Sequence, residues 1–496
     1  MKNAELVFIP APIIGHFASA VEVAKLLLER DKRLSITFLV MKSSLSTKIA
    51  LSYNDSVIAA CGRIRFIHLP EVELDPNLPS RFFISLIEAQ KAHVKEEVSK
   101  LVMESESSPD SPRLAGFVLD MFSASIIDVA NEFGVPSYIF FTSAAAFLGT
   151  TLYIQALHDE QKVDPTEFKN SDVELVMPCL ASPFPAKVLP SSLLGKDLLP
   201  LFLPLIRRFR EAKGIMVNTF YELESHAINS FSDGNYPPVY PVGPLLNLIN
   251  GHEHDVVSDR KDTHRDIMQW LDQQPSSSVV YLCFGSMGSF GVEQVKEIAC
   301  GLEQSGHRFL WSLRQPPPNG KMEAPSDYVN PAEVLPEGAE EIEKGVRCLM
   351  EIDIKKKEKL KEISEKSRKA LMKDGSSSTW LDRRVYGLGF PLLHGRSMYA
   401  EQQFNAFEVV VELGLAVEIK MDYRREFLIG NEIILGAKEI ERGIRGGMEP
   451  DCHKLKRLKE LSEKSRKAMM EGGSSFSSLS RLIEDMIIAG DDVHVP

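Results

Sequence analysis

The chain of 496 residues is long enough for two large domains or three small ones, at roughly 100–200 residues per domain. Its hydrophobic fraction of 44% is ample for large cores. A formal net charge of −12 argues against nucleic acid or an anionic membrane surface as a partner, so a small neutral or locally recognised ligand is expected.

Short apolar runs alternate with helical patterns through the first half of the chain. Residues 6–9 make a strand-like run that Pro10 and Pro12 end, and residues 18–28 carry apolar side chains at helical spacing. The same alternation predicts strands at 35–40, 64–69, 116–119, 138–141 and 213–218, and helices at 84–102 and 124–133. Strands that alternate with helices predict a parallel sheet covered on both faces.

The second half of the chain opens with a break in this pattern. Residues 236–243 are proline-rich and extended, and the polar stretch 250–263 is typical of an exposed linker. A new α/β unit follows, with a strand at 279–284, a loop at 285–289, a helix at 293–304 and a strand at 308–313. The sequence therefore predicts an α/β protein with two doubly wound domains joined near residue 250.

The cysteines and the N-terminus argue against several classes of protein. The six cysteines include no CxxC pair and no His/Cys cluster at metal-ligand spacing, so we expect reduced, mostly structural thiols and no metal site. The apolar run in MKNAELVFIPAP is too short for a signal peptide, and no stretch approaches the about 18 apolar residues of a membrane span. We therefore expect a cytoplasmic protein without membrane insertion.

His16 stands where ligands gather in open α/β sheets, at the carboxyl end of a strand. It follows the first predicted strand in the sequence Ile14-Gly15-His16 and comes immediately before a helix. An imidazole there is suited to act as a general base near neutral pH. The alternative is a histidine that caps the helix or bonds to a backbone carbonyl.

Asp120 occupies the equivalent position after the strand at 116–119. It is placed to reach His16, to fix its tautomer and to stabilise the imidazolium that forms when a proton is abstracted. Capping of the next helix is the alternative role. Because no nucleophilic Ser or Cys motif accompanies the pair, a His/Asp dyad favours deprotonation of a substrate hydroxyl over acyl-enzyme chemistry.

The loop FGSMGS at 284–289 follows a strand and precedes a helix, where backbone N–H groups and the helix dipole favour a phosphate. Ser286 is the residue predicted to contact that phosphate. The loop is neither GxGxxG nor a Walker A motif, so a kinase lacks its expected signature and a dehydrogenase is a distant alternative.

Long stretches of sequence, in the right order, also carry a family resemblance. They include ELVFIPAPIIGH, FVLDMFSASIIDVANEFGVPSYIFFTSAAAFLG, MVNTFYELES, YPVGPLLNL, WLDQQPSSSVVYLCFGSMGS, HRFLWSLR and SMYAEQQFNAFEVVVELGLAVEI. The chain thereby resembles plant family 1 of the UDP-sugar-dependent glycosyltransferases, which modify small molecules. The resemblance covers residues 1–337 and 387 to the end.

The resemblance implies a GT-B fold, in which two Rossmann-like domains face each other across a cleft. Residues 1–249 would bind the acceptor and residues 264–480 the sugar nucleotide, with a linker at 250–263 and a helix end and tail at 481–496. It also implies UDP-glucose as co-substrate, no cofactor, and transfer of glucose with inversion to a hydroxyl of a small lipophilic acceptor. His16 matches the family's catalytic base and Asp120 its charge-stabilising partner.

Aromatic residues suggest the acceptor side of the site. His16, Phe122 and Phe141 are the predicted acceptor contacts, and Phe147 and Phe184 would extend the same apolar pocket for a flat aromatic or terpenoid alcohol. Aromatic residues at such spacings are also typical of plain core, which is the alternative.

The donor side departs from the family's pattern. Residues 338–378 recur at 436–476, with LKE, SEKSRKA and GSS unchanged, and the first copy stands where the family's donor-binding signature belongs. Only the end of that signature is clear, in Glu401 and Gln402, which match the family's contacts to the sugar hydroxyls. Residues 389–391 are a candidate remnant of the preceding strand.

The other histidine and tryptophan of this region, His394 and Trp380, lack the family's flanking residues and are expected to be structural or incidental. The missing signature would hold uracil, ribose and diphosphate, and each charge-assisted bond contributes about 1.5–3 kcal/mol. Its loss predicts donor binding weakened by orders of magnitude. It also predicts an incomplete or patched sheet in the second domain.

Three hypotheses follow from this displacement. The chain is a glycosyltransferase with His16 and Asp120 as its dyad, or it is a non-catalytic relative that binds an acceptor-like small molecule but no donor. Under the third hypothesis the duplicated segment is an error of the gene model, and the real protein has an intact donor signature.

Overall fold

The computed structural model describes two compact units of the chain. The described residues are 3–42, 62–72, 82–108, 111–245, 267, 269–275, 278–284, 288–317, 325–328, 330–336, 385–388, 401–421, 434–449 and 452–491. One unit contains Met1–Asn247 together with Lys456–Pro496, and the other contains Leu248–Leu455. The expected second domain, 264–480, is therefore wrong at its end, because residues 456–480 group with the first unit.

The first unit is built on a seven-stranded sheet in which all neighbouring strands are parallel. The strands are β1 (Ala4–Ile9), β2 (Leu34–Val40), β3 (Ile64–His68), β4 (Arg113–Asp120), β5 (Ser137–Phe141), β8 (Gly214–Val217) and β9 (Val239–Pro241). Their order is β3-β2-β1-β4-β5-β8-β9, so the winding direction reverses between β1 and β4. Such a reversal is where open α/β sheets bind ligands.

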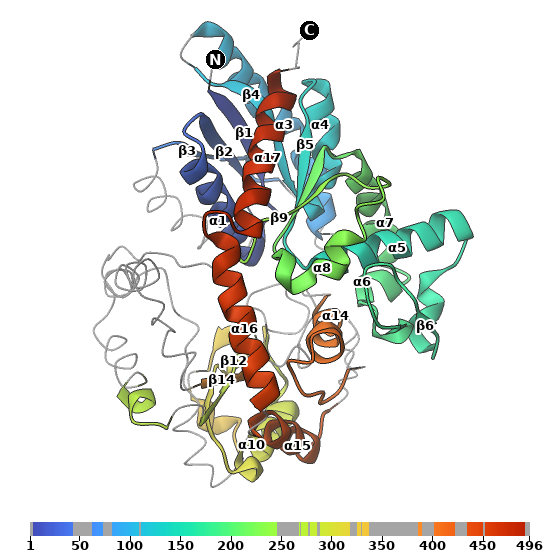
Figure 1. Cartoon of the computed structure of the whole chain (residues 1–496), viewed down its shortest axis with the longest axis vertical. Coiled ribbons are helices and arrows are strands. Elements are labelled where there is room, and N and C mark those ends of the chain that lie inside the picture. Colours follow the sequence, from blue (N-terminus) through green and yellow to red (C-terminus); the bar gives the residue numbers. More distant parts are fainter. Residues whose placement is uncertain are drawn as a thin grey trace. The chain divides into compact units, whose positions relative to one another are not determined.

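Helices accompany this sheet in the doubly wound arrangement (Figure 1). They are α1 (Ile14–Arg30), α3 (Phe82–Ser107), η2 (Met121–Ile126), α4 (Ile127–Glu132), α5 (Ala145–Gln161), η3 (Pro165–Asn170), η4 (Ala186–Val188), α6 (Ser191–Leu194), α7 (Leu199–Arg208), η5 (Phe209–Glu211), α8 (Tyr221–Asn229) and α17 (Ser474–Asp491). A small antiparallel pair, β6 (Glu174–Leu175) and β7 (Phe184–Pro185), completes the unit. Every residue of β1 and β5 is buried, as expected for central strands covered on both faces.

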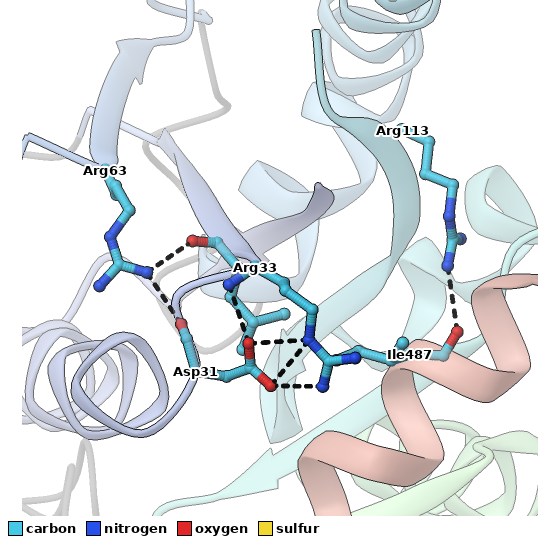
Figure 2. Close-up of polar contacts among 6 residues, drawn as sticks. Asp31, Arg33, Arg63, Arg113 and Ile487 are labelled. Atoms are coloured by element: carbon cyan, nitrogen blue, oxygen red, sulfur yellow. Dashed lines mark hydrogen bonds and ion pairs between the residues drawn. The ribbon is translucent and has the colours of Figure 1, made fainter. Parts of the chain in front are cut away.

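The last helix, α17, packs on the sheet of the first unit, against β4 and β9 (Figure 1). Arg113 of β4 donates a hydrogen bond to the backbone oxygen of Ile487 at 3.1 Å, which Figure 2 shows. Tyr240 of β9 donates to Asp485, and the Arg30 guanidinium lies 3.3 Å from the centre of the Phe476 ring. A helical pattern at the C-terminus does not tell which of two similar sheets the helix covers. The expected end of the second domain, residue 480, therefore lies later in the chain than the end of the second unit, Leu455.

The second unit has a smaller described sheet, in the order β11-β10-β14, again with parallel pairing. Its strands are β10 (Val279–Leu282), β11 (Arg308–Trp311) and β14 (Val385–Leu388), with the short pair β12 (Arg314–Gln315) and β13 (Ser326–Asp327) beside them in the chain. Its helices are α10 (Val292–Ser305), η6 (Pro331–Glu333), α14 (Gln402–Phe407), the π-helix η7 (Glu408–Glu412) and α15 (Ala437–Met448), and α16 (Cys452–Met469) crosses the boundary between units.

The second copy of the duplicated segment has a clear structural role here. It begins with α15, whose Ile440 and Ile444 are buried in the core against α10. A Cβ atom at Gly301 of α10 would lie 2.8 Å from Ile440, so a glycine is needed for the two helices to approach so closely. The first copy, 338–378, lies outside the described residues, as do residues 389–391, directly after β14.

Candidate functional site

The carboxyl ends of β1, β4 and β5 meet at one edge of the first sheet, because these strands are adjacent and parallel. His16 is the third residue of α1, the helix that follows β1. Asp120 is the last residue of β4, and Thr142 comes directly after β5. Local strand-to-helix turns therefore bring together three polar side chains that are far apart in the sequence.

His16 and Asp120 form a direct contact at this edge. The distance from His16 Nδ1 to Asp120 Oδ2 is 2.7 Å, and the side chains are 13% and 1% exposed. A carboxylate accepts a hydrogen bond only from a protonated nitrogen, so the contact assigns the proton of a neutral imidazole to Nδ1 and the lone pair to Nε2. A nitrogen with a lone pair is what a general base requires.

Asp120 also caps the helical segment that follows it, which was the alternative to a role in the site. Its Oδ1 accepts a hydrogen bond of 3.0 Å from the backbone N–H of Phe122, at the start of η2. This helical segment begins at Met121, earlier than the predicted 124. One carboxylate thus caps a helix and contacts the imidazole, and the cap holds it in place for the second task.

Phe122 and Phe141, both predicted to contact the acceptor, lie in different surroundings. The Phe122 ring is 5.2 Å from the His16 ring, centre to centre, at an interplanar angle of 31°, and the Phe202 ring packs edge-on against Phe122 at 5.9 Å. Phe141 is only 1% exposed and packs against Phe147 and Phe209. Phe122 therefore stays in the candidate site, whereas Phe141, with the buried Phe147 and Phe184, belongs to the core.

Two residues of this site had not been picked out from the sequence. The Thr142 hydroxyl oxygen lies 3.3 Å from His16 Nδ1. Its position directly after a strand is the signal that identified His16 and Asp120, so the same rule would have found it. Glu224 of α8 accepts hydrogen bonds from the backbone N–H groups of Ala145 and Ala146, at 3.2 and 2.8 Å, and no local pattern marks this contact across 78 residues.

Glu224 supplies a cap that the helix lacks locally. The N-cap of α5 is Ala144, whose side chain has no hydrogen-bonding group, and the buried carboxylate of Glu224 satisfies two N–H groups of the first turn instead. A negative charge at a helix N-terminus is also favourable. The turn from β5 to α5, which carries Thr142, is therefore held at its helical end.

Replacing Glu224 by alanine should lower the free energy of unfolding by about 1–3 kcal/mol, because two buried N–H groups lose their acceptor. The midpoint of urea unfolding measures the loss. Ser225→Ala, at an exposed position of the same helix, is the control and should change stability by about 0.5 kcal/mol or less. Equal effects of the two substitutions would contradict the capping role.

The residues predicted to contact the donor belong to the second unit. Ser286 lies outside the described residues. Glu401 directly precedes α14 and Gln402 is its first residue, and both are partly buried. Within the described ranges, no group of three His, Cys, Asp or Glu side chains is arranged to hold a metal ion. No helix in the same part of the chain is both long and apolar enough to span a membrane.

A cavity of about 220 Å³ lies at the other end of the first sheet, where the strands begin. Its walls include Glu5 of β1 and Arg63, the residue directly before β3, and Arg63 donates to the backbone oxygens of Asp31 and Leu34 at 2.8 and 3.0 Å (Figure 2). Burial raises the pKa of the Glu5 carboxyl, which accepts from the Thr37 hydroxyl at 2.5 Å. These polar groups link neighbouring strands and their connections, at the end of the sheet opposite to the dyad.

Comparisons with known proteins agree with the fold of this chain. A family model described as UDP-glucoronosyl and UDP-glucosyl transferase matches residues 212–326. Anthocyanidin 3-O-glucosyltransferase 1 of Manihot esculenta is 51% identical, over 96% of this chain and 100% of the relative. UDP-glycosyltransferase 71A15 of Malus domestica is 48% identical, over 97% of this chain and 99% of the relative.

Solved structures give the same result. A UGT transferase from Siraitia grosvenorii in complex with UDP is 41% identical with a TM-score of 0.77, covering 98% of this chain and 100% of that one. UGT71G1 of Medicago truncatula, complexed with UDP-glucose, is 36% identical with a TM-score of 0.76, covering 98% of both. The chain therefore belongs to plant family 1 of the UDP-glycosyltransferases, enzymes of the GT-B fold that take a UDP-sugar as co-substrate.

Proposed function

We propose that this chain transfers glucose from UDP-glucose, with inversion, to a hydroxyl of a small flat phenolic acceptor, and that His16 is the base. The observation that carries the proposal is the 2.7 Å contact between His16 and Asp120 at the point where the winding of the first sheet reverses. The names of relatives support the substrate class, since they specify anthocyanidin and UDP-glucose flavonoid 3-O-glucosyl transfer.

The proposed step is a single displacement. The lone pair on His16 Nε2 takes the proton of the acceptor hydroxyl as its oxygen attacks the anomeric carbon of glucose. The bond from that carbon to the diphosphate oxygen breaks with its electron pair, and UDP leaves. Asp120, in contact with Nδ1, stabilises the imidazolium that results. Attack on the face opposite the leaving group inverts the anomeric configuration.

Phe122 supplies an apolar surface beside this base. Its ring lies against the imidazole and is itself packed by Phe202 of α7, while Nδ1 of the imidazole keeps its contact with Asp120. A flat phenol gains from stacking on an aromatic face, and an apolar wall strengthens the charge interactions of the dyad. We propose Phe122, with His16, as the acceptor contacts.

We propose Glu401 and Gln402 as contacts to the sugar hydroxyls and Ser286 as a phosphate contact. The duplicated segment at 338–378 stands in place of the donor signature, which supports weak binding of UDP-glucose. The match of the family model, which ends at residue 326, is consistent with this displacement. The same observation favours one second candidate, a non-catalytic protein that binds the acceptor alone.

One experiment separates the two candidates. The full chain is incubated with millimolar UDP-glucose and a flavonol, the product is quantified by chromatography, and its anomeric configuration is read by NMR. We expect a β-glucoside, the inverted product of an α-linked donor. Binding of the flavonol without any glucoside, at every donor concentration, would favour the binding protein, and an α-glucoside would contradict the single displacement.

A further inference from the structure

We propose that Thr142 is a positioning residue for His16, an inference that rests on the proposed function. Its hydroxyl oxygen lies 3.3 Å from His16 Nδ1, the nitrogen that Asp120 Oδ2 contacts at 2.7 Å. The proton on Nδ1 therefore has two oxygen atoms within reach. The shorter contact is the main hydrogen bond and the longer one makes it a three-centre bond.

A second acceptor restricts a motion that the first one permits. An imidazole held at one nitrogen by one carboxylate oxygen is still able to swing about that bond. Thr142 approaches from β5 and Asp120 from β4, so the two oxygens reach Nδ1 from neighbouring strands. The Phe122 ring packs against the imidazole, with 5.2 Å between the ring centres. Together these contacts limit the directions in which Nε2 can point, and a general base acts well only in a fixed geometry.

The position of Thr142 is itself well determined. Only Thr142, Ser143 and Ala144 link β5 to α5. One end of this link continues a fully buried central strand, and the other end is held by the Glu224 carboxylate on the N–H groups of α5. A short link with two anchored ends leaves little freedom to the side chain between them. The hydroxyl is thus presented to His16 by the fold.

The test measures the imidazole proton directly and needs no turnover. The full chain is labelled with ¹⁵N-histidine, and the His16 signals are identified by their loss in His16→Gln. Exchange of the Nδ1 proton with water is then compared among the wild type, Thr142→Val and Thr142→Ser. Valine matches threonine in shape but has no hydroxyl, whereas serine keeps the hydroxyl. Thr142→Ala serves as a second hydroxyl-free variant if the valine protein does not fold.

We expect the valine and alanine variants to exchange this proton about 2- to 10-fold faster, the effect of losing one modest hydrogen bond on a local opening equilibrium. Serine should retain the wild-type rate. The backbone amide of Ala146, held by Glu224, should exchange at the same rate in all variants. This last readout separates positioning of His16 from a general loosening of the turn.

Three results would overturn the inference. These are an unchanged rate in the hydroxyl-free variants, a serine variant that behaves like valine, and an equal acceleration at the Ala146 amide. A wild-type His16 with its proton on Nε2 would instead overturn the proposed function, because such a ring has no lone pair to offer the acceptor. The two failures are therefore distinguishable in one set of spectra.

Discussion

Replacement of Asp120 by asparagine is expected to lower glucosyl transfer by about 10²–10⁴-fold while the protein stays folded. The asparagine oxygen can keep the cap on the Phe122 N–H, which preserves the start of η2. Its NH₂ group then faces His16 Nδ1, where the carboxylate accepts a hydrogen bond in the wild type. Because an amide NH₂ donates, Nδ1 must accept, and the proton of the neutral ring moves to Nε2. With its proton on Nε2, the imidazole has no lone pair facing the acceptor and can no longer act as the base.

The measurement is kcat/KM for glucoside formation, with urea unfolding to show that stability is kept. Asp128→Asn is a matched control, since Asp128 is half-exposed on α4 and pairs with Arg208 at 2.6 Å, outside the dyad. It should leave the rate within about twofold, because surface ion pairs contribute little. An Asp120→Asn protein with nearly wild-type activity would show that Asp120 only caps the helix.

Restoring the donor signature should tighten the binding of UDP-glucose by about 10²–10⁴-fold. The change replaces residues 338–386 by the matching stretch of the Medicago truncatula relative, whose structure contains UDP-glucose. Recovery of just two charge-assisted hydrogen bonds, at about 1.5–3 kcal/mol each, accounts for a gain of this size. The acceptor unit and its dyad are unchanged in the chimaera.

Titration calorimetry with UDP-glucose measures this gain, and flavonol binding serves as the internal reference that should stay constant. A second chimaera, with a flexible linker of the same length in place of 338–386, controls for mere removal of the duplicated segment. It should not gain affinity. Equal affinities of the wild type and the restored chain would show that the displaced signature is not what limits donor binding.

The dyad could be predicted from the sequence because its two residues obey a local rule. His16 and Asp120 each follow a strand and precede a helix, and parallel neighbouring strands place such positions on one edge. Local sequence patterns do not give the order of the strands. The 2.7 Å contact between His16 and Asp120 forms only because β1 and β4 are neighbours in the sheet. Thr142 obeys the same rule and was overlooked because a threonine suggests no chemistry by itself.

Other features depended on contacts that no local pattern encodes. Glu224 caps a helix that begins 79 residues earlier, where Ala144 offers no cap of its own. Phe141 and Phe122 are the same residue type and look alike in the sequence, but their burial differs. Phe141 lies in the buried central strand β5, whereas Phe122 lies on the helical segment after β4. The return of α17 to the first sheet likewise follows from packing with Arg113 and Tyr240.

The most direct test of the account compares the wild type with His16→Gln at the same UDP-glucose and flavonol concentrations, with the rate of β-glucoside formation as the readout. Glutamine keeps a polar side chain of similar reach but has no basic nitrogen. The account predicts measurable formation of the glucoside by the wild type and a loss of about 10²–10⁴-fold in the variant. A His16→Gln protein that forms the glucoside as fast as the wild type would contradict it.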